Sequence, residues 1–407
     1  MKCRLCGSGD LLSVVDLGAT PPCELFLTEA QLDEPEQTYP LHLRVCTSCW
    51  LAQLPPLITP EETFTEYAYF SSFSTSWVQH AKDFVDAQVE RIDPGFVVEV
   101  ASNDGYLLQH VVERGIRCLG IEPSANVGAA AREKGVPTVT EFLSPETAAA
   151  VRAEHGPADL VVANNVYAHI PDVVGFTKGL RALVADDGWV SIEVQHLLTL
   201  MELTQYDTIY HEHFQYYTVA SAQRALASGG LSLVDVELVP THGGSIRLLA
   251  RPSEVAGEPT RAVHDVLARE KAAGLHELAG YTEFAQRVAK VRRDLLGFLV
   301  AAADQGRAVV GYGAPGKGNT LLNHCGIRPD LLAYTVDRNP YKHGRYTPGT
   351  RIPIMAPEQI AVDKPDYVVV LPWNLRAELT EQLSYVGEWG GRLVFPIPHL
   401  EIVEVTP

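Results

Sequence analysis

Short apolar runs alternate with longer amphipathic segments over the middle of the chain. A continuous apolar run of four to eight residues is typical of a strand buried on both faces. The predicted strands are residues 96–100, 118–122, 138–140, 159–163 and 189–194, and the predicted helices are 78–92, a segment ending at 112, and 125–134. Because strands alternate with helices, the pattern predicts a parallel α/β sheet that binds ligands at its carboxyl edge.

A second alternation follows a charged, helical connector over residues 253–300. Its predicted strands are residues 308–312, 332–336, 367–371 and 392–395, with a helix from Asn319 onward. No clear repeat relates the two α/β halves. We therefore divide the chain into residues 1–66, a small module, residues 67–252, a central α/β domain, and residues 253–407, a C-terminal α/β domain.

Four of the seven cysteines form two Cys-x-x-Cys pairs, Cys3 with Cys6 and Cys46 with Cys49. Each pair offers two thiolates from one tight turn, and together they suit tetrahedral Zn²⁺. The intervening segment, residues 7–45, exceeds the usual gap of a zinc ribbon and predicts an insertion that loops out. Disulfide or redox chemistry is the alternative. Four thiolates leave no open coordination position, so we expect structural zinc. Ordinary buried residues are predicted for the others, Cys23, Cys118 and Cys325.

The composition and net charge indicate which kinds of binding partner to expect. The 407 residues carry a net charge of −18 and are 46% hydrophobic. Since nucleic-acid binding depends on clustered Lys and Arg, this charge argues against a polyanionic partner. No apolar run long enough for a membrane span and no signal-peptide core is visible. We expect a cytoplasmic protein, a monomer, with a small-molecule substrate and no nucleic acid or membrane partner.

The run from Tyr210 to Phe214 concentrates acid–base groups, with His211, Glu212 and His213 between. Imidazole can accept and return a proton near neutral pH. If the run is extended, His211 and His213 share one face. A polar surface loop or a His-x-His metal site are the alternatives, although the spacing differs from the HExxH pattern of zinc proteases.

The turn after the first predicted strand carries acids. Glu99 and Asp104 lie in it beside Gly105, and Glu122 ends the second strand, where an acid can accept hydrogen bonds from both hydroxyls of a ribose. Carboxylates would repel the pyrophosphate of NAD but suit the sulfonium and ammonium groups of S-adenosylmethionine. The charge pattern therefore favours S-adenosylmethionine.

A second glycine-rich loop, residues 311–318, is closer to a dinucleotide fingerprint. Gly316 and Lys317 could meet a pyrophosphate, and Asp337 lies downstream at the spacing of a ribose-binding acid. NAD, another pyrophosphate-linked nucleotide, or a tight turn without a ligand remain open for this loop. Residues 61–80, rich in aromatic and hydroxyl groups, are either an amphipathic connector or a lid over a polar substrate.

These motifs, in this order, resemble the S-adenosylmethionine-dependent C-methyltransferases of deoxysugar biosynthesis, which methylate a ring carbon of dTDP-linked 4-keto-6-deoxyhexoses. Besides the four-cysteine module, the resemblance rests on the runs at 69–72, 98–108, 164–169, 209–214 and 313–323. It covers nearly the whole chain. One departure is Cys23-Glu24 after Pro21-Pro22, where the family has a small apolar residue and Asn.

The resemblance implies a zinc-binding module, a central Rossmann-like class I methyltransferase domain and a C-terminal Rossmann-like domain that binds the nucleotide sugar. The implied catalytic residues are His213 as general base with Tyr210, Glu212, Tyr69 and His169. The cofactor-binding residues would be Glu99, Ala101, Asn103, Gly105, Tyr106, Glu122 and Asn164. The substrate-binding residues would be Asn165, Lys317, Gly316, Asn319 and Asp337.

The chemistry fits these residue types. A proton alpha to a ketone is too weakly acidic for imidazole unless the enolate is stabilised, and one donor to the oxyanion contributes about 3–4 kcal/mol. We expect His213 to remove the proton, Tyr210 or His169 to donate to the oxyanion, and Glu212 to orient His213 or the sugar. The enolate carbon would then attack the sulfonium methyl.

Three alternatives remain at this stage. The first is an NAD-dependent sugar-nucleotide oxidoreductase that uses the 311–318 loop. The second is a zinc-ribbon adaptor for protein or RNA, and the third is a tRNA or protein methyltransferase. Both carbons beside a 4-ketone are acidified, so C-3 is favoured but C-5 is possible.

Overall fold

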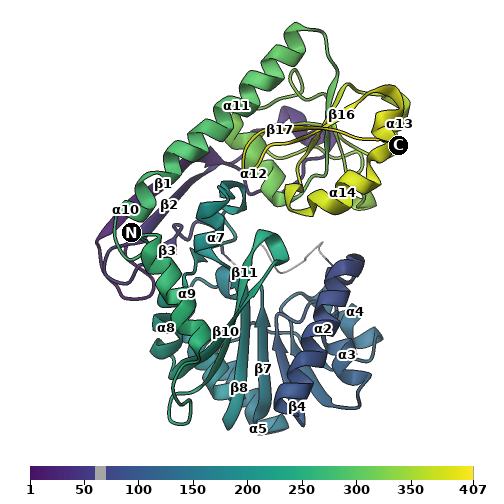
Figure 1. The fold of residues 1–407 in the computed structure, drawn as a ribbon. Helices are drawn as coiled ribbons and strands as arrows, with labels where there is room; N and C mark the ends of the chain where they lie inside the picture. Colours follow the sequence, from purple (N-terminus) through teal and green to yellow (C-terminus); the bar gives the residue numbers. More distant parts are fainter. Residues whose placement is uncertain (60–69, 407) are drawn as a thin grey trace. The chain divides into compact units, whose positions relative to one another are not determined.

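The computed structural model describes residues 1–59 and 70–406, and the chain forms two compact units (Figure 1). The first unit contains residues 1–12, 45–197 and 212–276, and the second contains 13–44, 198–211 and 277–407. Each unit is built around a mainly parallel sheet with helices, as the sequence predicts. The domain boundaries at 66 and 252 stay a prediction.

The first unit holds a seven-stranded sheet in the order β10-β11-β8-β7-β4-β5-β6. Its strands are β4 (Phe96–Val100), β5 (Arg117–Ile121), β6 (Thr138–Val139), β7 (Ala158–Asn164), β8 (Val184–Gln195), β10 (Leu231–Val239) and β11 (Ser245–Pro252). The five predicted strands are all present and parallel. The antiparallel pair β10–β11, which extends the sheet beyond β8, was not predicted.

Helices cover both faces of this sheet. Val98 and Val161 pack on one face with α5 (Pro145–His155), α6 (Val173–Leu183) and α8 (Val219–Ser228). Val97 and Val162 pack on the other with α2 (Thr75–Ile92), α3 (Leu108–Val112) and α4 (Ala125–Glu133) (Figure 1). Neighbouring residues of a strand point to opposite faces, which explains why these strands are apolar throughout. By the same alternation, the side chains of Glu99 and Glu193 point to the face that α2 covers.

The remaining elements of the first unit are short. They are β3 (Ala52–Gln53), which pairs with β9 (Gln215–Tyr216), the 3-10 helix η3 (Tyr167–His169) and α9 (Arg261–Ala272). Glu270 of α9 is fully buried and accepts from the Val219 N–H at 2.5 Å and from His196 at 3.0 Å. This carboxylate satisfies the first donors of α8 and therefore fixes where that helix begins.

The second unit holds a six-stranded sheet in the order β14-β13-β12-β15-β16-β17, parallel except for β17. Its strands are β12 (Val309–Tyr312), β13 (Thr335–Val336), β14 (Ile354–Met355), β15 (Tyr367–Val370), β16 (Arg392–Phe395) and β17 (Glu401–Glu404). Its helices are α7 (Leu197–Glu202), α10 (Ala279–Thr282), α11 (Phe284–Asp304), α12 (Gly316–Cys325), α13 (Gln359–Asp363) and α14 (Arg376–Gln382).

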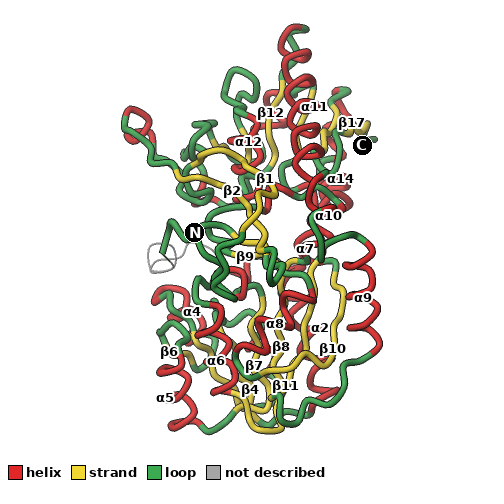
Figure 2. Tube along the Cα trace, turned by 90° about the vertical axis from the view of Figure 1, so that its left-hand side faces the viewer, coloured by secondary structure: helices red, strands yellow, loops and turns green. Residues whose placement is uncertain are grey.

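Two early strands, β1 (Leu11–Thr20) and β2 (Tyr39–Cys46), belong mainly to the second unit (Figure 2). The segment between them packs on α12, where Asn319 donates to the Cys23 carbonyl at 2.6 Å. The predicted insertion between the cysteine pairs is therefore a folded part of the second unit. In the described part of the chain, no helix has the length and apolar character needed to cross a membrane.

Candidate active site

The turn after β4 is tightly coiled. Ala101, Asn103 and Gly105 all have positive φ, at 55°, 50° and 76°. A Cβ on Gly105 would lie 2.9 Å from Val136 Cγ2, so this position requires glycine. Such left-handed backbone at non-glycine residues is costly and clusters at functional sites.

Asn103 ties this turn to its surroundings. Its N–H donates to Glu122 Oε2 at 2.9 Å, and its side-chain oxygen accepts from the Ser71 N–H at 2.8 Å. The other oxygen of Glu122 accepts from the Ser124 N–H at 2.8 Å. The carboxylate predicted to bind the ribose is thus held rigidly at the end of β5.

Glu99, Asp104 and Glu122 form a buried acidic group around the turn. Burial, together with the charges of Glu122 and Asp104, raises the pKa of Glu99 well above its ordinary value. Lys134 reaches Asp104 at 2.8 Å. A bound cation would relieve the remaining repulsion, which is the charge pattern that S-adenosylmethionine matches.

Unpartnered buried atoms also point to a ligand here. Glu99 Oε2, Asn164 Oδ1 and Asn165 Nδ2 are buried, and none has a hydrogen-bond partner among residues 1–59 and 70–406. Glu99 is the second-last residue of β4, Asn164 is the last residue of the adjacent strand β7, and Asn165 donates its N–H to the Glu193 carbonyl at 2.7 Å. Unsatisfied buried polar groups are rare, so these atoms fit the polar end of a bound cofactor.

Replacing Glu122 by glutamine is expected to weaken S-adenosylmethionine binding by about 10- to 100-fold, because charged hydrogen bonds to the ribose contribute about 1.5–3 kcal/mol. Isothermal titration calorimetry measures the effect. Glu113→Gln, at an exposed acid beyond α3, is the control and should bind normally. Equal affinities for the two variants would remove Glu122 from the cofactor site.

The Tyr210–Phe214 run is not an extended strand. A turn at residues 211–212 separates the two imidazoles. His211 is buried in the second unit, donates to the Tyr39 carbonyl at 3.1 Å, and packs edge-on against the Tyr39 ring. Burial lowers the pKa of His211, so it is a neutral, structural group.

His213 lies in the first unit and is half-buried. Its ring meets the ring of His169 edge-on at 4.7 Å between centroids, and that of Tyr216 at 6.0 Å. Burial lowers the pKa of His169 to about 4. A hydrogen bond to the Glu212 main chain acts in the opposite direction but is the smaller effect. His169 is therefore neutral near pH 7.

The structure brings the Tyr210–Phe214 run and the segment after β7 together through the main chain. Phe214 donates its N–H to the Ala168 carbonyl at 2.8 Å. Gln215, which the sequence analysis missed, donates its amide to the carbonyls of Tyr167 at 2.7 Å and Ile170 at 2.9 Å. These bonds hold the turn that carries His169 against His213.

A second polar group that the sequence did not predict lies on the face of the sheet that α2 covers. Glu193 of β8 is fully buried and contacts His80 at 3.0 Å, Arg247 at 2.8 Å and Thr241 at 2.8 Å. Burial alone would raise the pKa of Glu193, but the hydrogen bond and charge of His80 and the charge of Arg247 outweigh it and lower the pKa to about 2. The pairing of β8 with β11 brings Arg247 to Glu193, and packing of α2 on the sheet adds His80. These residues are far apart in the sequence, so no local motif could predict the group.

Glu193 should make stability depend on acid pH. Its folded pKa lies below the ordinary value of 4.5, so its contribution of about 3 kcal/mol is present above pH 4.5 and is lost as pH falls toward 2. Glu193→Gln should lower the free energy of unfolding at pH 7, with the difference from wild type shrinking below pH 4.5. Urea unfolding across pH 3–7 measures this. The control Glu237→Gln removes the more exposed partner of Arg247 and should have a smaller effect; parallel pH profiles for wild type and Glu193→Gln would contradict the assignment.

The glycine-rich loop of the second unit, residues 311–318, forms hydrogen bonds to other residues of that unit. The Gly316 N–H, at the start of α12, bonds to the Glu24 carboxylate. A Cβ on Gly316 would lie 2.8 Å from both Glu24 Oε1 and Cys23 Sγ. Asp337 accepts from the Ala314 N–H at 2.7 Å and from the Asn339 N–H at 2.8 Å.

Lys317 donates to Asn374 Oδ1 at 2.7 Å. Asn319, fully buried, binds the Cys23 carbonyl. The substrate-binding roles of Gly316, Lys317, Asn319, Asp337 and Asn165 therefore stay predictions. Tyr69 lies outside the described residues, as do residues 61–68 of the 61–80 segment.

The four cysteines predicted to bind zinc converge. Their sulfur atoms all lie within 4.8 Å of one another, with Cys3 and Cys49 at 3.5 Å and Cys6 and Cys46 at 3.6 Å. A tetrahedral site with Zn–S bonds of about 2.3 Å requires sulfurs about 3.8 Å apart. The Gln53 amide contacts Cys3 Sγ at 3.2 Å and supports this set from outside.

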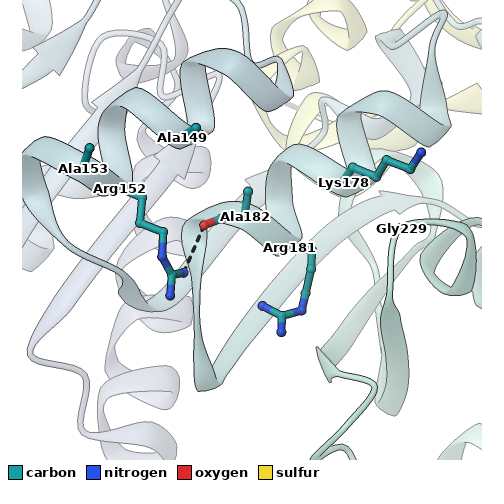
Figure 3. A pocket seen from close by; sticks show the side chains of 7 residues that line it. All are labelled: Ala149, Arg152, Ala153, Lys178, Arg181, Ala182 and Gly229. Carbon is teal, nitrogen blue, oxygen red and sulfur yellow. Dashed lines mark hydrogen bonds between the residues drawn. The ribbon is translucent and has the colours of Figure 1, made fainter.

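A hollow of about 530 Å³ opens elsewhere on the first unit (Figure 3). It is lined by Ala149, Arg152, Ala153, Lys178, Arg181, Ala182 and Gly229. These residues include the carboxyl ends of α5 and α6, which lead into β7 and β8, so the hollow lies toward the amino edge of the parallel strands. Ligands of such sheets bind at the opposite edge, and this hollow is not part of the site.

Comparisons with known proteins agree with this arrangement. Residues 3–64 match a zinc binding domain, 77–236 a methyltransferase domain, and 240–398 a C-methyltransferase C-terminal domain. The chain is 38% identical over 405 residues to the C-methyltransferase NovU of Streptomyces niveus, covering 99% of this chain and 96% of that protein.

Among solved structures, it is similar to magnesium protoporphyrin IX methyltransferase of Synechocystis PCC 6803 with bound S-adenosylmethionine, at 17% identity and a TM-score of 0.32, over 44% of this chain and 84% of that one. It is also similar to the PH0226 protein of Pyrococcus horikoshii OT3, at 13% identity and a TM-score of 0.36, over 45% and 94%. At these TM-scores the two likenesses support no conclusion.

Fold and site together define an S-adenosylmethionine-dependent methyltransferase with a zinc-binding domain. The full-length similarity is more specific: the chain belongs to the C-methyltransferases, and the family predicted from its motifs is confirmed at that level. S-adenosylmethionine supplies the methyl group when bound, and Glu99, Glu122 and Asn164 are the residues that would hold it.

Proposed function

We propose that the enzyme methylates a ring carbon beside the ketone of a dTDP-linked 4-keto-6-deoxysugar, with C-3 favoured over C-5, in the biosynthesis of a branched deoxysugar. The observation that carries the proposal is the contact of half-buried His213 with His169, five residues past the carboxyl end of β7. It supports a role for His213 as base, because the imidazole lies at the sheet edge that also carries Glu99 and Glu122. The motif resemblance and the 38% identity to a C-methyltransferase support it.

In this proposal His213 takes the proton alpha to the ketone. His211 is the weaker base, because burial lowers its pKa and its ring is fixed on the Tyr39 carbonyl. Glu212, buried beside His213 in the chain, orients His213 or the sugar's polar substituent. The reacting carbon and the methyl group need near-attack geometry, which the rigid turns after β4 and β7 favour.

Tyr210 is the better donor to the enolate oxygen. Neutral His169 has a single N–H, and its hydrogen bond to the Glu212 main chain uses it. A phenol keeps its proton near pH 7 and can donate it as the oxyanion forms. Tyr69 keeps the sugar-contacting role that the resemblance implies.

The test is to incubate the enzyme with S-adenosylmethionine and dTDP-4-keto-6-deoxyglucose and to locate the new methyl carbon by NMR. We expect methylation at C-3. A new methyl at C-5 would revise the position, and transfer to oxygen or nitrogen, or none with this class of substrate, would overturn the proposal.

The alternative of an NAD-dependent oxidoreductase is not supported by the second loop. In a dinucleotide site the pyrophosphate lies at the helix N-terminus. Here the Glu24 carboxylate already accepts the N–H of the first residue of α12, and a second anion there would be repelled.

A further inference from the structure

A buried carboxylate of the second unit lies in the turn that leads to Tyr210. Asp207 belongs to the 3-10 helix η4 (Tyr206–Thr208) and is fully buried. Its Oδ2 accepts from the indole N–H of Trp373 at 2.6 Å. Its Oδ1 has no hydrogen-bond partner in the described part of the chain. The groups that donate to this carboxylate, the Trp373 indole and the main chain of Asp207 and Thr208, are all neutral, so an opposite charge nearby would stabilise it further.

Lys317 lies against the same Trp373 indole that donates to Asp207, and it is the candidate counter-charge. Burial raises the pKa of Asp207 to about 6, and the charge of Lys317 is the largest effect opposing it. In turn, burial lowers the pKa of Lys317, and Asp207 opposes this. The ammonium lies 5.3 Å from the centre of the Trp373 ring and donates to Asn374, next in the chain. Asp207, Trp373 and Lys317 thus form one cluster.

The turn itself is fixed on α12. The Tyr206 hydroxyl lies 3.7 Å from Cys325 Sγ, and its ring meets the His324 ring edge-on at 5.2 Å. The Ile209 N–H returns to the Tyr206 carbonyl at 3.0 Å. Tyr210 follows at once, so the position of its backbone depends on this turn.

We infer that Lys317 is the internal counter-ion of Asp207 rather than a ligand of the diphosphate, and that the Asp207–Trp373–Lys317 cluster positions Tyr210. The second clause rests on the proposed function. If Lys317 turned to a phosphate, Asp207 would be left buried without an opposite charge. A lysine that serves a ligand keeps its ammonium available, whereas this one is occupied by Asn374 and the Trp373 ring.

A double-mutant cycle tests the counter-ion. Urea unfolding is measured for Asp207→Asn, Lys317→Met and the double variant. Each single change should lower the folding equilibrium constant, and the double variant should lose about tenfold less than the product of the two singles. The exposed pair Lys290 and Asp294 on α11 is the matched control and should show almost no coupling. Additive losses at Asp207 and Lys317 would overturn the assignment.

Binding of thymidine diphosphate, measured by calorimetry, tests the ligand role. Lys317→Met should bind it within about threefold of wild type, since other groups hold the nucleotide. A loss of tenfold or more that persists in the Asp207→Asn background would show that Lys317 contacts the diphosphate and would overturn the inference.

Steady-state kinetics test whether the Asp207–Trp373–Lys317 cluster positions Tyr210. Asp207→Asn and Lys317→Met should lower kcat with KM for the nucleotide sugar nearly unchanged, because a displaced Tyr210 loses its contact to the transition state. An unchanged kcat, or an increase confined to KM, would overturn the positioning role. If the wild-type enzyme methylates no ketosugar, the proposed function fails, while the unfolding cycle still decides the counter-ion.

Discussion

Replacement of His213 by asparagine is expected to lower kcat for ketosugar methylation by about 10²–10⁴-fold, the usual contribution of a general base. Asparagine keeps the polarity and approximate size of the ring near the main chain but cannot take a proton. S-adenosylmethionine binding should stay close to normal, because the acids predicted to bind it, Glu99 and Glu122, lie on other elements. Steady-state kinetics and calorimetry measure the two effects.

The run supplies its own control. His211→Asn removes an imidazole two positions away that is bound to the Tyr39 carbonyl. We expect it to lower stability by about 1 kcal/mol, the net value of one hydrogen bond, and to leave kcat within a few-fold of wild type. If His211→Asn abolished turnover while His213→Asn kept it, the base would be the wrong histidine.

Loss of one zinc ligand should have the largest effect on stability. Structural zinc in small modules contributes about 10–16 kcal/mol of apparent binding free energy at pH 7, and that energy is folding energy. Cys49→Ser should reduce the zinc content from about one ion per chain to near zero and should lower the melting temperature of the first unit. Elemental analysis and calorimetric melting check both.

The buried Cys118 of β5 provides the matched control. Cys118→Ser should keep the metal and change stability only modestly, since it touches none of the four sulfurs. Retention of zinc by Cys49→Ser, or its loss in Cys118→Ser, would contradict the assignment of the site.

Strands buried on both faces were the easiest part of the fold to predict. Phe96–Val100 and Arg392–Phe395 begin and end at the predicted residues. The helix after the second glycine-rich loop begins at Gly316, three residues before the predicted Asn319, because the Glu24 carboxylate satisfies its first N–H. Strand β13 is shorter than predicted, since only Thr335 and Val336 pair with neighbours. The antiparallel β10–β11 pair was missed because its pattern is not apolar throughout.

The residues of the candidate site also fall into those that the sequence could predict and those that it could not. Cys3, Cys6, Cys46 and Cys49 could be predicted because spacing alone encodes their ligand geometry, and the four sulfurs converge. The acids Glu99 and Glu122 could be predicted to lie close together because each is at the carboxyl end of a parallel strand, Glu99 as the second-last residue of β4 and Glu122 directly after β5. Gln215, His80 and Glu193 could not, since their partners lie far away in the chain and depend on strand register.

By itself, the sequence determined the α/β class, the zinc ligands and the cofactor preference, because each depends on short-range pattern and charge. Only the tertiary structure decided which partner each buried polar side chain contacts. It bound His211 to Tyr39 and left His213 against His169, and it gave Lys317 the buried Asp207 as a partner. The reason is physical: burial makes a polar side chain's behaviour depend on which partner reaches it, and the partner is chosen by packing between distant segments.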